Sequence, residues 1–418
     1  MSNSVIAISE NPLVQSEPQI SQVRSTMSLP NKCVVASEKL AVYFHWPFCL
    51  SKCPYCDFNS HVSSNINHDH WRRAFLAEIR RMASWIGGRN VTSIFFGGGT
   101  PSLMAPKTVA AILDEVAKQW TVDERPEITL EANPTSSDSA TFRDFHSAGI
   151  NRLSLGIQAL QDDALKFLGR THSAAEGLIA AEIGASVFSR ISIDLIYGRP
   201  KQSTEDWRRE LKNALDLVDD HISVYQLTIE KGTPFYDLHR RGTLVLPTDK
   251  KAEGLYEITQ KVLNEAGLPS YEISNHARPG GESRHNLAYW RYQDYLGIGP
   301  GAHSRIVVNS KMLAIEQFRT PKRWLQATEQ ETGATLSKTA LSQAQSIREM
   351  VMMGLRLKNG LNKTWFEDRT GVKLDDAINF PATMNLESAG LIINQKEQLR
   401  LTPLGLMVLN SVLAKILI

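Results

Sequence analysis

Between residues 41 and 230, short apolar segments alternate with segments of helical periodicity, and this alternation limits the possible folds more than any other feature of the chain. The apolar segments are rich in β-branched and aromatic residues, as in AVYFHWP (41–47) and SRISIDLIYG (189–198). Strands that alternate with helices form βαβ units and a parallel sheet. The sequence therefore predicts an α/β fold.

Six such units can be distinguished, which indicates a barrel or a partial barrel. The predicted strands are 41–47, 92–99, 127–134, 152–160, 189–198 and 221–230, and the predicted helices are 71–86, 108–120, 137–146, one or two within 161–185, and 204–217. In a parallel barrel the chemistry lies at the carboxyl ends of the strands. Polar residues, glycines or cysteines gather at or near each of these ends, so one rim of the barrel is predicted to carry the site.

Composition and charge limit the other possibilities. Hydrophobic residues make up 42% and charged residues 22% of the 418 residues, which is typical of a globular protein, and the net charge of +2 gives no argument for a nucleic-acid partner. Residues 1–39 are rich in Ser, Asn, Gln and Pro and are predicted to be a disordered extension. This segment resembles neither a secretory signal nor an Arg-rich transit peptide, so we expect a cytoplasmic protein.

Three of the four cysteines, Cys49, Cys53 and Cys56, lie within eight residues. Such clustering in a chain without a disulfide framework indicates metal binding or redox chemistry. Three thiolates are too few for a tetrahedral zinc site, although His45 or His61 could supply a fourth ligand, and zinc remains the alternative. Three thiolates match a [4Fe–4S] cluster in which one iron has no protein ligand.

Aromatic and apolar side chains surround these cysteines and would shield a redox cluster from water. They are Phe44, Trp46, Phe48, Tyr55 and Phe58. A second motif, the GGGTP loop at 97–101, follows the next predicted strand. Glycines there would let backbone groups approach a bound ligand closely.

C-x3-C-x2-C after a first strand, followed by GGGTP, resembles the radical S-adenosylmethionine (SAM) superfamily. YFHWPFC and CPYCDF narrow the resemblance to the branch around oxygen-independent coproporphyrinogen III oxidase, and later segments agree: LEANP (130–134), RLSLGIQ (152–158), DLIYG (194–198) and GIGPGAHS (297–304). The resemblance runs from about residue 40 to the C-terminus. It implies a partial (β/α)6 barrel in which SAM chelates the open iron and is cleaved reductively to a radical.

The same resemblance implies a set of site residues. Cys49, Cys53 and Cys56 would hold the cluster, and the cofactor-binding positions would be Tyr43, Tyr55, Gly98, Gly99, Thr100, Glu131, Gln158, Arg170, Asp194 and Ile298. Carboxylates among them can bind the ribose hydroxyls or the ammonium group of SAM. The planar guanidinium of Arg170 can pair with the SAM carboxylate, and Ile298 would lie near the adenine.

Phe58 departs from the oxidase pattern, because the oxidase has a further cysteine two residues after the third one. This departure is typical of the HemW family of haem chaperones, and HNLAYW (285–290) matches the HNxxYW motif of that family. His285 could ligate haem iron, and Tyr289 and Trp290 could pack on a porphyrin. His276 and His303 are nearby alternatives as ligands.

The remaining chain divides into two further regions. Residues 236–335 are predicted to be a connecting region that completes the site, with Asp294, Tyr295 and GIGPG beside it. Residues 336–418 resemble the small winged-helix-like domain of the family. They contain an amphipathic segment at 346–357, helix-turn-helix elements at 362–371 and 375–390, a hairpin that turns at 395–398 and a last helix. This domain is not visibly basic, so we expect a lid or a docking surface and no nucleic-acid partner.

The sequence thus indicates a haem chaperone that contains a [4Fe–4S] cluster and SAM, carries haem as cargo and delivers it to haem-dependent acceptors such as respiratory proteins. The resemblance also implies a homodimer and peripheral membrane association through the acceptor. The first alternative is oxidative decarboxylation of coproporphyrinogen III. The second is another radical SAM reaction, such as methyl transfer.

Overall fold

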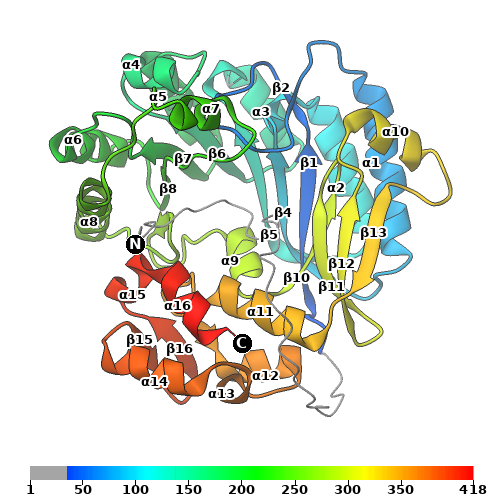
Figure 1. Ribbon diagram of the computed structural model, residues 1–418. Coiled ribbons are helices and arrows are strands. Elements are labelled where there is room, and N and C mark those ends of the chain that lie inside the picture. Colours follow the sequence, from blue (N-terminus) through cyan, green and yellow to red (C-terminus); the bar gives the residue numbers. More distant parts are fainter. Residues whose placement is uncertain (1–34, 137, 418) are drawn as a thin grey trace.

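The computed structural model describes residues 35–136 and 138–417, and its centre is an 11-stranded sheet (Figure 1). Six parallel strands lie side by side in chain order: β1 (Lys39–Trp46), β4 (Asn90–Gly98), β5 (Thr121–Ala132), β6 (Arg152–Gln158), β7 (Arg190–Tyr197) and β8 (His221–Gln226). This order confirms the predicted partial (β/α)6 barrel. The predicted extension lies almost entirely outside the described residues.

Helices on the outer face connect these strands: α1 (His68–Ala83), α2 (Pro106–Gln119), α3 (Ser139–Ser147), α4 (Asp162–Phe167), α5 (Ala174–Val187) and α6 (Thr204–Leu215). Side-chain caps fix where several of them begin. Ser173 and Glu176 form a capping box at α5, and Asp138 accepts hydrogen bonds from the first turn of α3. The predicted helices match these, with ends that differ by a few residues.

Strand β5 is the main difference among the six strands, because it begins at Thr121 and not at residue 127. Thr121 and Val122 pair with Asn90 and Val91 of β4, and the register then shifts before Glu127. The segment between is polar and partly exposed, so its sequence lacks the apolar run that marks a strand. Backbone pairing with β4 therefore starts β5 at Thr121, before the apolar residues that mark a strand in the sequence.

The two faces of the barrel strands differ in polarity. In β7, Ile191, Ile193 and Leu195 join the apolar core that the outer helices cover, whereas Ser192 and Asp194 point to the opposite, inner face. A polar interior means that the barrel is lined with hydrogen-bonding groups. That arrangement is suited to holding polar ligands and is costly unless those groups find partners.

Five further strands extend the same sheet; four lie in the predicted connecting region, and the fifth starts at its last residue and otherwise lies in the predicted C-terminal region. β9 (Asn275–Ala277) pairs with β8 at one edge, and β10 (Asp294–Ile298), β11 (His303–Val308), β12 (Lys311–Gln317) and β13 (Thr335–Ala340) extend the other edge from β1. The region also contains α7 (Pro234–Arg240), α8 (Asp249–Glu265), α9 (Arg284–Trp290) and α10 (Pro321–Thr328). The pairing of β10 with β1 joins segments about 250 residues apart and leaves no local signal. In contrast, β11 and β12 form a hairpin that turns at Asn309 and Ser310, and sequence reasoning missed this local signal.

The C-terminal region packs below the sheet as a separate apolar cluster (Figure 1). Its elements are α11 (Gln343–Gly354), β14 (Leu361–Asn362), α12 (Lys363–Thr370), α13 (Leu374–Ala377), α14 (Phe380–Ser388), β15 (Ile392–Asn394), β16 (Gln398–Leu401), α15 (Pro403–Met407) and α16 (Leu409–Ile416). The three strands form one small sheet, and the hairpin turns where it was predicted, with the amide of Gln395 donating to the carbonyl of Gln398. Within the segment 375–390, which was predicted to belong to helix-turn-helix elements, α13 and α14 are separate helices, and Pro381 lies in the first turn of α14.

Two further strands complete the described structure, the short pair β2 (Phe48–Cys49) and β3 (His61–Val62). Across the residues that the structure describes, no helix is both long and apolar enough to span a bilayer.

A buried ion pair attaches the C-terminal region to the barrel. The Arg369 guanidinium of α12 donates to Asp294 Oδ1 at 2.7 Å and to the carbonyl of Val35 at 2.8 Å, and the side chains of Arg369 and Asp294 are both 0% exposed. Arg89 approaches the other carboxylate oxygen at 3.4 Å. Asp294 begins β10 and therefore lies at the end of the parallel strands opposite the site. The expectation that Asp294 lies beside the site is wrong.

We predict that Asp294→Ala destabilises the protein by about 3–5 kcal/mol, because it leaves Arg369 buried without a carboxylate. The measurement is the free energy of unfolding in denaturant. Asp375→Ala is the control, since Asp375 pairs with Lys363 at 2.9 Å but is 44% exposed, and its loss should cost less than about 1 kcal/mol. Equal costs for the two variants would contradict the role given to Asp294.

Candidate functional site

The three cysteines lie on one loop at the carboxyl end of the first barrel strand. After β1 the chain forms β2, which pairs in parallel with β3, and the loop between them carries Cys53 and Cys56. The amide of Cys56 donates to the carbonyl of Cys53 in a tight turn. All three side chains are free thiols and are partly buried.

Each sulfur lies beside a polar side chain. The Thr100 hydroxyl donates to Cys49 Sγ at 3.4 Å, Arg170 Nη1 donates to Cys53 Sγ at 3.5 Å, and Ser60 Oγ lies 3.9 Å from Cys56 Sγ. Burial raises the pKa of Cys49, and it raises the pKa of Cys56 to about 11. These two thiols therefore keep their protons near neutral pH unless a metal charge compensates the thiolates.

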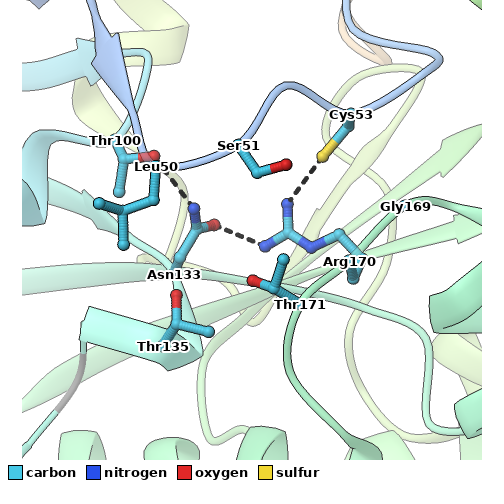
Figure 2. Close-up of a pocket in the computed structure, with 9 residues that line it drawn as sticks. All are labelled: Leu50, Ser51, Cys53, Thr100, Asn133, Thr135, Gly169, Arg170 and Thr171. Atoms are coloured by element: carbon cyan, nitrogen blue, oxygen red, sulfur yellow. Dashed lines mark hydrogen bonds between the residues drawn. The ribbon is translucent and has the colours of Figure 1, made fainter. Parts of the chain in front are cut away.

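A polar pocket opens beside the cysteine loop (Figure 2). Arg170 Nη2 donates to Asn133 Oδ1 and, at 2.8 Å, to the carbonyl of Gly156, while Asn133 Nδ2 donates to the Thr100 hydroxyl at 3.0 Å. Thr100 follows β4, Asn133 follows β5, Gly156 lies near the end of β6 and Arg170 follows α4. One hydrogen-bonded chain therefore joins three strand ends to the cysteine loop. The remaining lining residues are Leu50, Ser51, Thr135, Gly169 and Thr171.

The glycines after β4 form a close backbone contact with the cysteine strand. The amide of Gly99 donates to the carbonyl of Trp46 at 2.7 Å, and the amide of Thr100 donates to the carbonyl of Phe48 at 2.8 Å. A Cβ on Gly99 would lie 2.6 Å from the Phe48 carbonyl oxygen. Gly98 has φ of +113°, a conformation that favours glycine.

The other predicted cofactor residues take different positions. Gly98 donates its amide to Glu131 Oε2 at 3.3 Å, which joins two predicted residues. Asp194 lies deeper on the inner face, where Ser154 donates to it at 3.4 Å, and burial raises its pKa to about 6. Gln158 has a positive φ of 72°, and its side-chain oxygen is buried without a hydrogen-bond partner among the described residues.

Tyr55 and Ile298 complete the predicted set. Tyr55 packs near Phe235, and burial raises the pKa of its hydroxyl, with Cys53 and Arg170 as its polar neighbours. The side chain of Ile298 is fully buried in the apolar core on the outer face of the sheet. Its side chain therefore does not face the inner site, and only the backbone of this residue could contact a ligand there.

Asn59 is a structural residue of the site that sequence reasoning missed. Its Nδ2 donates to the carbonyls of Pro300 and Arg319 at 2.9 and 2.8 Å. These bonds leave Oδ1 to accept from His61 Nε2, and the Asn59 carbonyl accepts from His45 Nε2. Asn59 thus fastens the cysteine loop to segments more than 240 residues away, a contact that leaves no local signal in the sequence.

The same contacts bear on the zinc alternative. With Nε2 of His45 donating to Asn59, Nδ1 accepts from the Tyr43 hydroxyl at 3.0 Å, so both ring nitrogens of His45 are engaged. In the part of the chain that the structure describes, no group of three His, Cys, Asp or Glu side chains is placed to hold a single metal ion. A [4Fe–4S] cluster distributes its ligands over separate iron atoms, so three thiols around it need not converge on one point. Because both ring nitrogens of His45 are engaged, three thiols remain as the donor set, and three thiols fit a [4Fe–4S] cluster better than a four-ligand zinc site.

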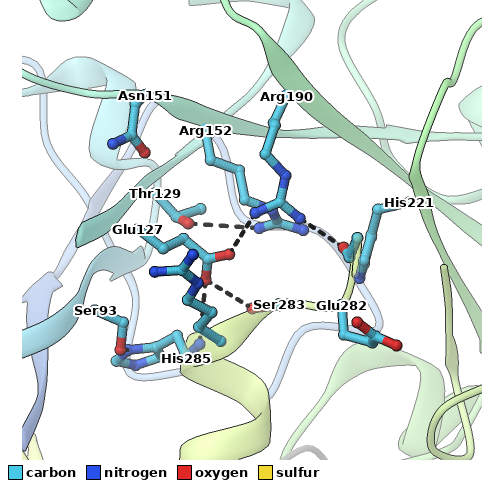
Figure 3. Close-up of polar contacts among 12 residues, drawn as sticks. Ser93, Glu127, Thr129, Asn151, Arg152, Arg190, His221, Glu282, Ser283 and His285 are labelled. Atoms are coloured by element: carbon cyan, nitrogen blue, oxygen red, sulfur yellow. Dashed lines mark hydrogen bonds and ion pairs between the residues drawn. The ribbon is translucent and has the colours of Figure 1, made fainter. Parts of the chain in front are cut away.

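A second polar group fills the opposite end of the barrel, around α9 (Figure 3). Glu127 accepts from the amide of His285 at 3.1 Å and pairs with Arg190 at 2.8 Å, and Arg190 also pairs with Asp220. Burial opposes the ionisation of Glu127, but the charges of Arg152 and Arg190 and the backbone donors outweigh it and lower its pKa. These contacts fix the start of α9 inside the barrel.

The predicted haem ligand His285 is part of this buried group. It is 1% exposed, its Nδ1 is hydrogen-bonded to Ser93 Oγ at 3.2 Å, and its Nε2 to the Tyr289 hydroxyl at 3.0 Å. Burial lowers its pKa to about 3, so the ring is neutral. Both nitrogens are occupied in this conformation, and ligation of haem iron by His285 requires α9 to move. The haem-binding role of His285, Tyr289 and Trp290 stays a prediction.

The two alternative histidines differ from His285. His276 is also buried, with Nδ1 bonded to the carbonyl of Leu268 at 3.3 Å, but its Nε2 has no partner among the described residues. His303 lies near the cysteine end, 3.8 Å from Glu316. The structure therefore separates the three histidines and does not gather them into one haem pocket.

Comparisons with known proteins identify the family. A Radical SAM superfamily model matches residues 43–214, and a HemN C-terminal domain model matches residues 341–408. The heme chaperone HemW of Escherichia coli is 34% identical over 377 residues, which cover 90% of this chain and 97% of that protein. This chain belongs to the HemW family of radical SAM proteins.

Other relatives of the HemW family and one solved structure extend the comparison. The mitochondrial radical S-adenosyl methionine domain-containing protein 1 of Danio rerio is 36% identical and covers 93% of this chain and 88% of its own length. The structure of the coproporphyrinogen III oxidase HemN of Escherichia coli aligns with a TM-score of 0.75 over 91% of this chain and 90% of that chain, at 22% identity. That oxidase therefore shares the fold.

Gly99→Ala should remove most of the iron and sulfide that the HemW-type site can hold. The added Cβ would push against the Phe48 carbonyl and displace the strand that carries Cys49, and overpacking of this kind costs about 1–3 kcal/mol or more. Gly87→Ala is the matched control, because a Cβ there meets nothing within 4 Å. Iron and sulfide contents after anaerobic reconstitution are the measurement, and equal contents in both variants would contradict the importance of this contact.

Proposed function

We propose that this protein is a haem chaperone that uses a [4Fe–4S] cluster and SAM and delivers haem to haem-dependent proteins. The observation that carries the proposal is the nearly full-length likeness to the heme chaperones HemW of Escherichia coli and Haemophilus influenzae, at 34% and 35% identity over 90% of this chain. Phe58 supports it, because this residue occupies the position of an additional oxidase cysteine and presents an exposed ring, not a thiol.

Cys49, Cys53 and Cys56 would hold the cluster, and the pocket beside Arg170 would hold the methionyl part of SAM. When bound, these groups supply reductive radical chemistry. Arg170 presents a fixed guanidinium that can orient a carboxylate, because Asn133 and Gly156 already hold one end of it. Gln158 offers an unpartnered side-chain oxygen, and Glu131 and Asp194 offer carboxylates to an ammonium group or to ribose hydroxyls.

The partners follow from the same proposal. Acceptors would be haem-dependent proteins, including respiratory ones, with contact to a membrane only through the acceptor. Free thiols at Cys49, Cys53 and Cys56 require a reducing compartment, which supports a cytoplasmic location. The C-terminal region would serve as a docking surface or lid and not as a reader of nucleic acid.

The decisive experiment offers haem and coproporphyrinogen III to the same anaerobically reconstituted protein. We expect stoichiometric haem binding, seen in the Soret absorption, and no protoporphyrinogen when coproporphyrinogen III is supplied with SAM and a reductant. Rapid protoporphyrinogen formation would instead identify an oxidase. Cys49→Ser is the companion variant: it should lose the cluster and keep haem, since the α9 group and the cysteine loop lie at opposite ends of the barrel.

The affinity for SAM should rise with pH through about 6. Burial raises the pKa of Asp194 to about 6, so its carboxyl is protonated below this pH and ionised above it, and the ionised form binds a cationic ligand more strongly. The difference between a charged and a neutral hydrogen bond predicts a rise of roughly fivefold. Asp194→Asn should abolish the rise.

Calorimetric titration with SAM at several pH values from 5 to 8 measures this dependence. Asp375→Asn, which changes a partly exposed carboxylate in the C-terminal region, should keep the wild-type slope. A slope that survives in Asp194→Asn would place the titrating group elsewhere.

A further inference from the structure

Helix α9 ends at the junction between the barrel and the C-terminal region, where it contacts α11 (Figure 1). Trp290 is the last residue of α9, and Arg356 lies two residues beyond the end of α11. The Arg356 guanidinium carbon is 5.6 Å from the centre of the Trp290 ring, so the two side chains meet across the junction. The amide of Lys358 donates to the carbonyl of Tyr271 at 3.0 Å and fixes the backbone beside Arg356.

Arg356 is a buried cation, 6% exposed, and no carboxylate of the described residues forms a hydrogen bond with it. Its Nε is buried without a hydrogen-bond partner in the same part of the chain. Three other buried arginines donate to carboxylates: Arg199 to Glu210, Arg305 to Glu349 and Arg369 to Asp294. The buried Arg152 donates to the hydroxyl of Thr129 at 3.5 Å. A buried guanidinium without such a partner loses the hydrogen bonds that water would give it.

Trp290 adds a second buried donor without a hydrogen-bond partner. Its indole Nε1 is buried and has no acceptor among the described residues. An indole nitrogen can only donate, so its hydrogen bond must come from an oxygen or another acceptor that the described chain does not supply there. Two neighbouring buried donors without acceptors, one of them charged, are complementary to a carboxylate.

Glu272 is the carboxyl group whose charge acts on Arg356, but it is otherwise engaged. Its Oε1 accepts from the amide of Ser274 at 3.1 Å and from Asn275 Nδ2, and burial raises its pKa. Glu272 therefore favours the charge of Arg356 from a distance and leaves the guanidinium donors unused. The donors of Arg356 remain available to a ligand.

We propose that Arg356 and the indole N–H of Trp290 bind a carboxylate, and that this carboxylate is a propionate of the haem cargo. A guanidinium binds a carboxylate through two parallel donors, and the indole supplies a third. Haem is the ligand of the proposed function that carries carboxylates on a flat apolar ring, and the Trp290 ring lies beside the donors. The identity of the carboxylate rests on the proposed function.

The proposed carboxylate site lies at the junction between the barrel and the C-terminal region. Arg356 belongs to the C-terminal region, whereas Trp290 ends the helix that fills the barrel. A carboxylate held by both would therefore connect the C-terminal region to α9, whose movement is required if His285 is to reach haem iron.

Haem and haem dimethyl ester, in which both propionates are esterified, are the two probes. With the full-length reconstituted protein, we expect haem to bind at least about tenfold more tightly than the ester, as hydrogen bonds to a charged group predict. Arg356→Gln should weaken haem binding by about tenfold and leave ester binding unchanged. Trp290→Phe, which keeps an aromatic ring and removes the N–H, should show a smaller loss of the same kind.

Arg348→Gln is the matched control, because Arg348 is exposed on α11 and loses the same charge. Arg356→Lys keeps the charge without the planar fork and should bind haem with intermediate affinity, which covers the case in which Arg356→Gln does not fold. Equal affinities of the wild-type protein for haem and ester, or equal weakening of both by Arg356→Gln, would overturn the propionate site. Failure of the wild-type protein to bind either probe would overturn the proposed function itself.

Addition of a peptide rich in glutamate tests whether the site binds protein carboxylates and not the propionates of haem. If that peptide competes with haem in the wild-type protein and not in Arg356→Gln, while haem and ester bind equally, the junction recognises protein carboxylates and the propionate assignment is wrong.

Discussion

The backbone contact between the glycine loop and the cysteine strand is the constraint on which the site depends. Two hydrogen bonds, from Gly99 to Trp46 and from Thr100 to Phe48, join the end of β4 to the segment that carries Cys49. Because no side chain fits between these backbones, the loop that faces the cysteines must contain glycine at residue 99. The Thr100 hydroxyl then reaches Cys49 and continues through Asn133 to Arg170. This close contact thus places Thr100 beside Cys49, and the hydrogen-bonded chain leads from there to Arg170 beside Cys53.

The polar interior of the barrel has a second consequence. Groups such as Glu127 and Arg190 cannot remain buried without partners, and α9 supplies part of what they need through the amide of His285 and the hydroxyl of Ser283. The HNLAYW motif therefore fills one end of the barrel and is also a candidate haem site. Both roles are compatible only if α9 can move, and the buried hydrogen bonds of His285 determine the free-energy cost of this movement.

The C-terminal region packs against one side of α9 through α11. It is fixed to the barrel by the Arg369–Asp294 pair at the start of β10 and by the Arg305–Glu349 pair between β11 and α11. Between these fixed points, Arg356 approaches Trp290, and no carboxylate of the described residues forms a hydrogen bond with it. The junction thus combines ion pairs that hold the two regions together with the cation that we propose as the carboxylate site.

The sequence by itself determined the barrel and predicted the cluster residues. Periodicity marked the six parallel strands, since buried strands and amphipathic helices have local signatures, and the spacing of Cys49, Cys53 and Cys56 indicated the cluster chemistry. Only the tertiary structure decided what depends on distant pairing. It added five strands to the sheet, moved Asp294 to the opposite end, turned the side chain of Ile298 into the core, and placed Asn59 and His285 in networks whose other members lie up to 260 residues away. A residue's type shows what it can bind, but burial and long-range partners decide whether it is free to do so.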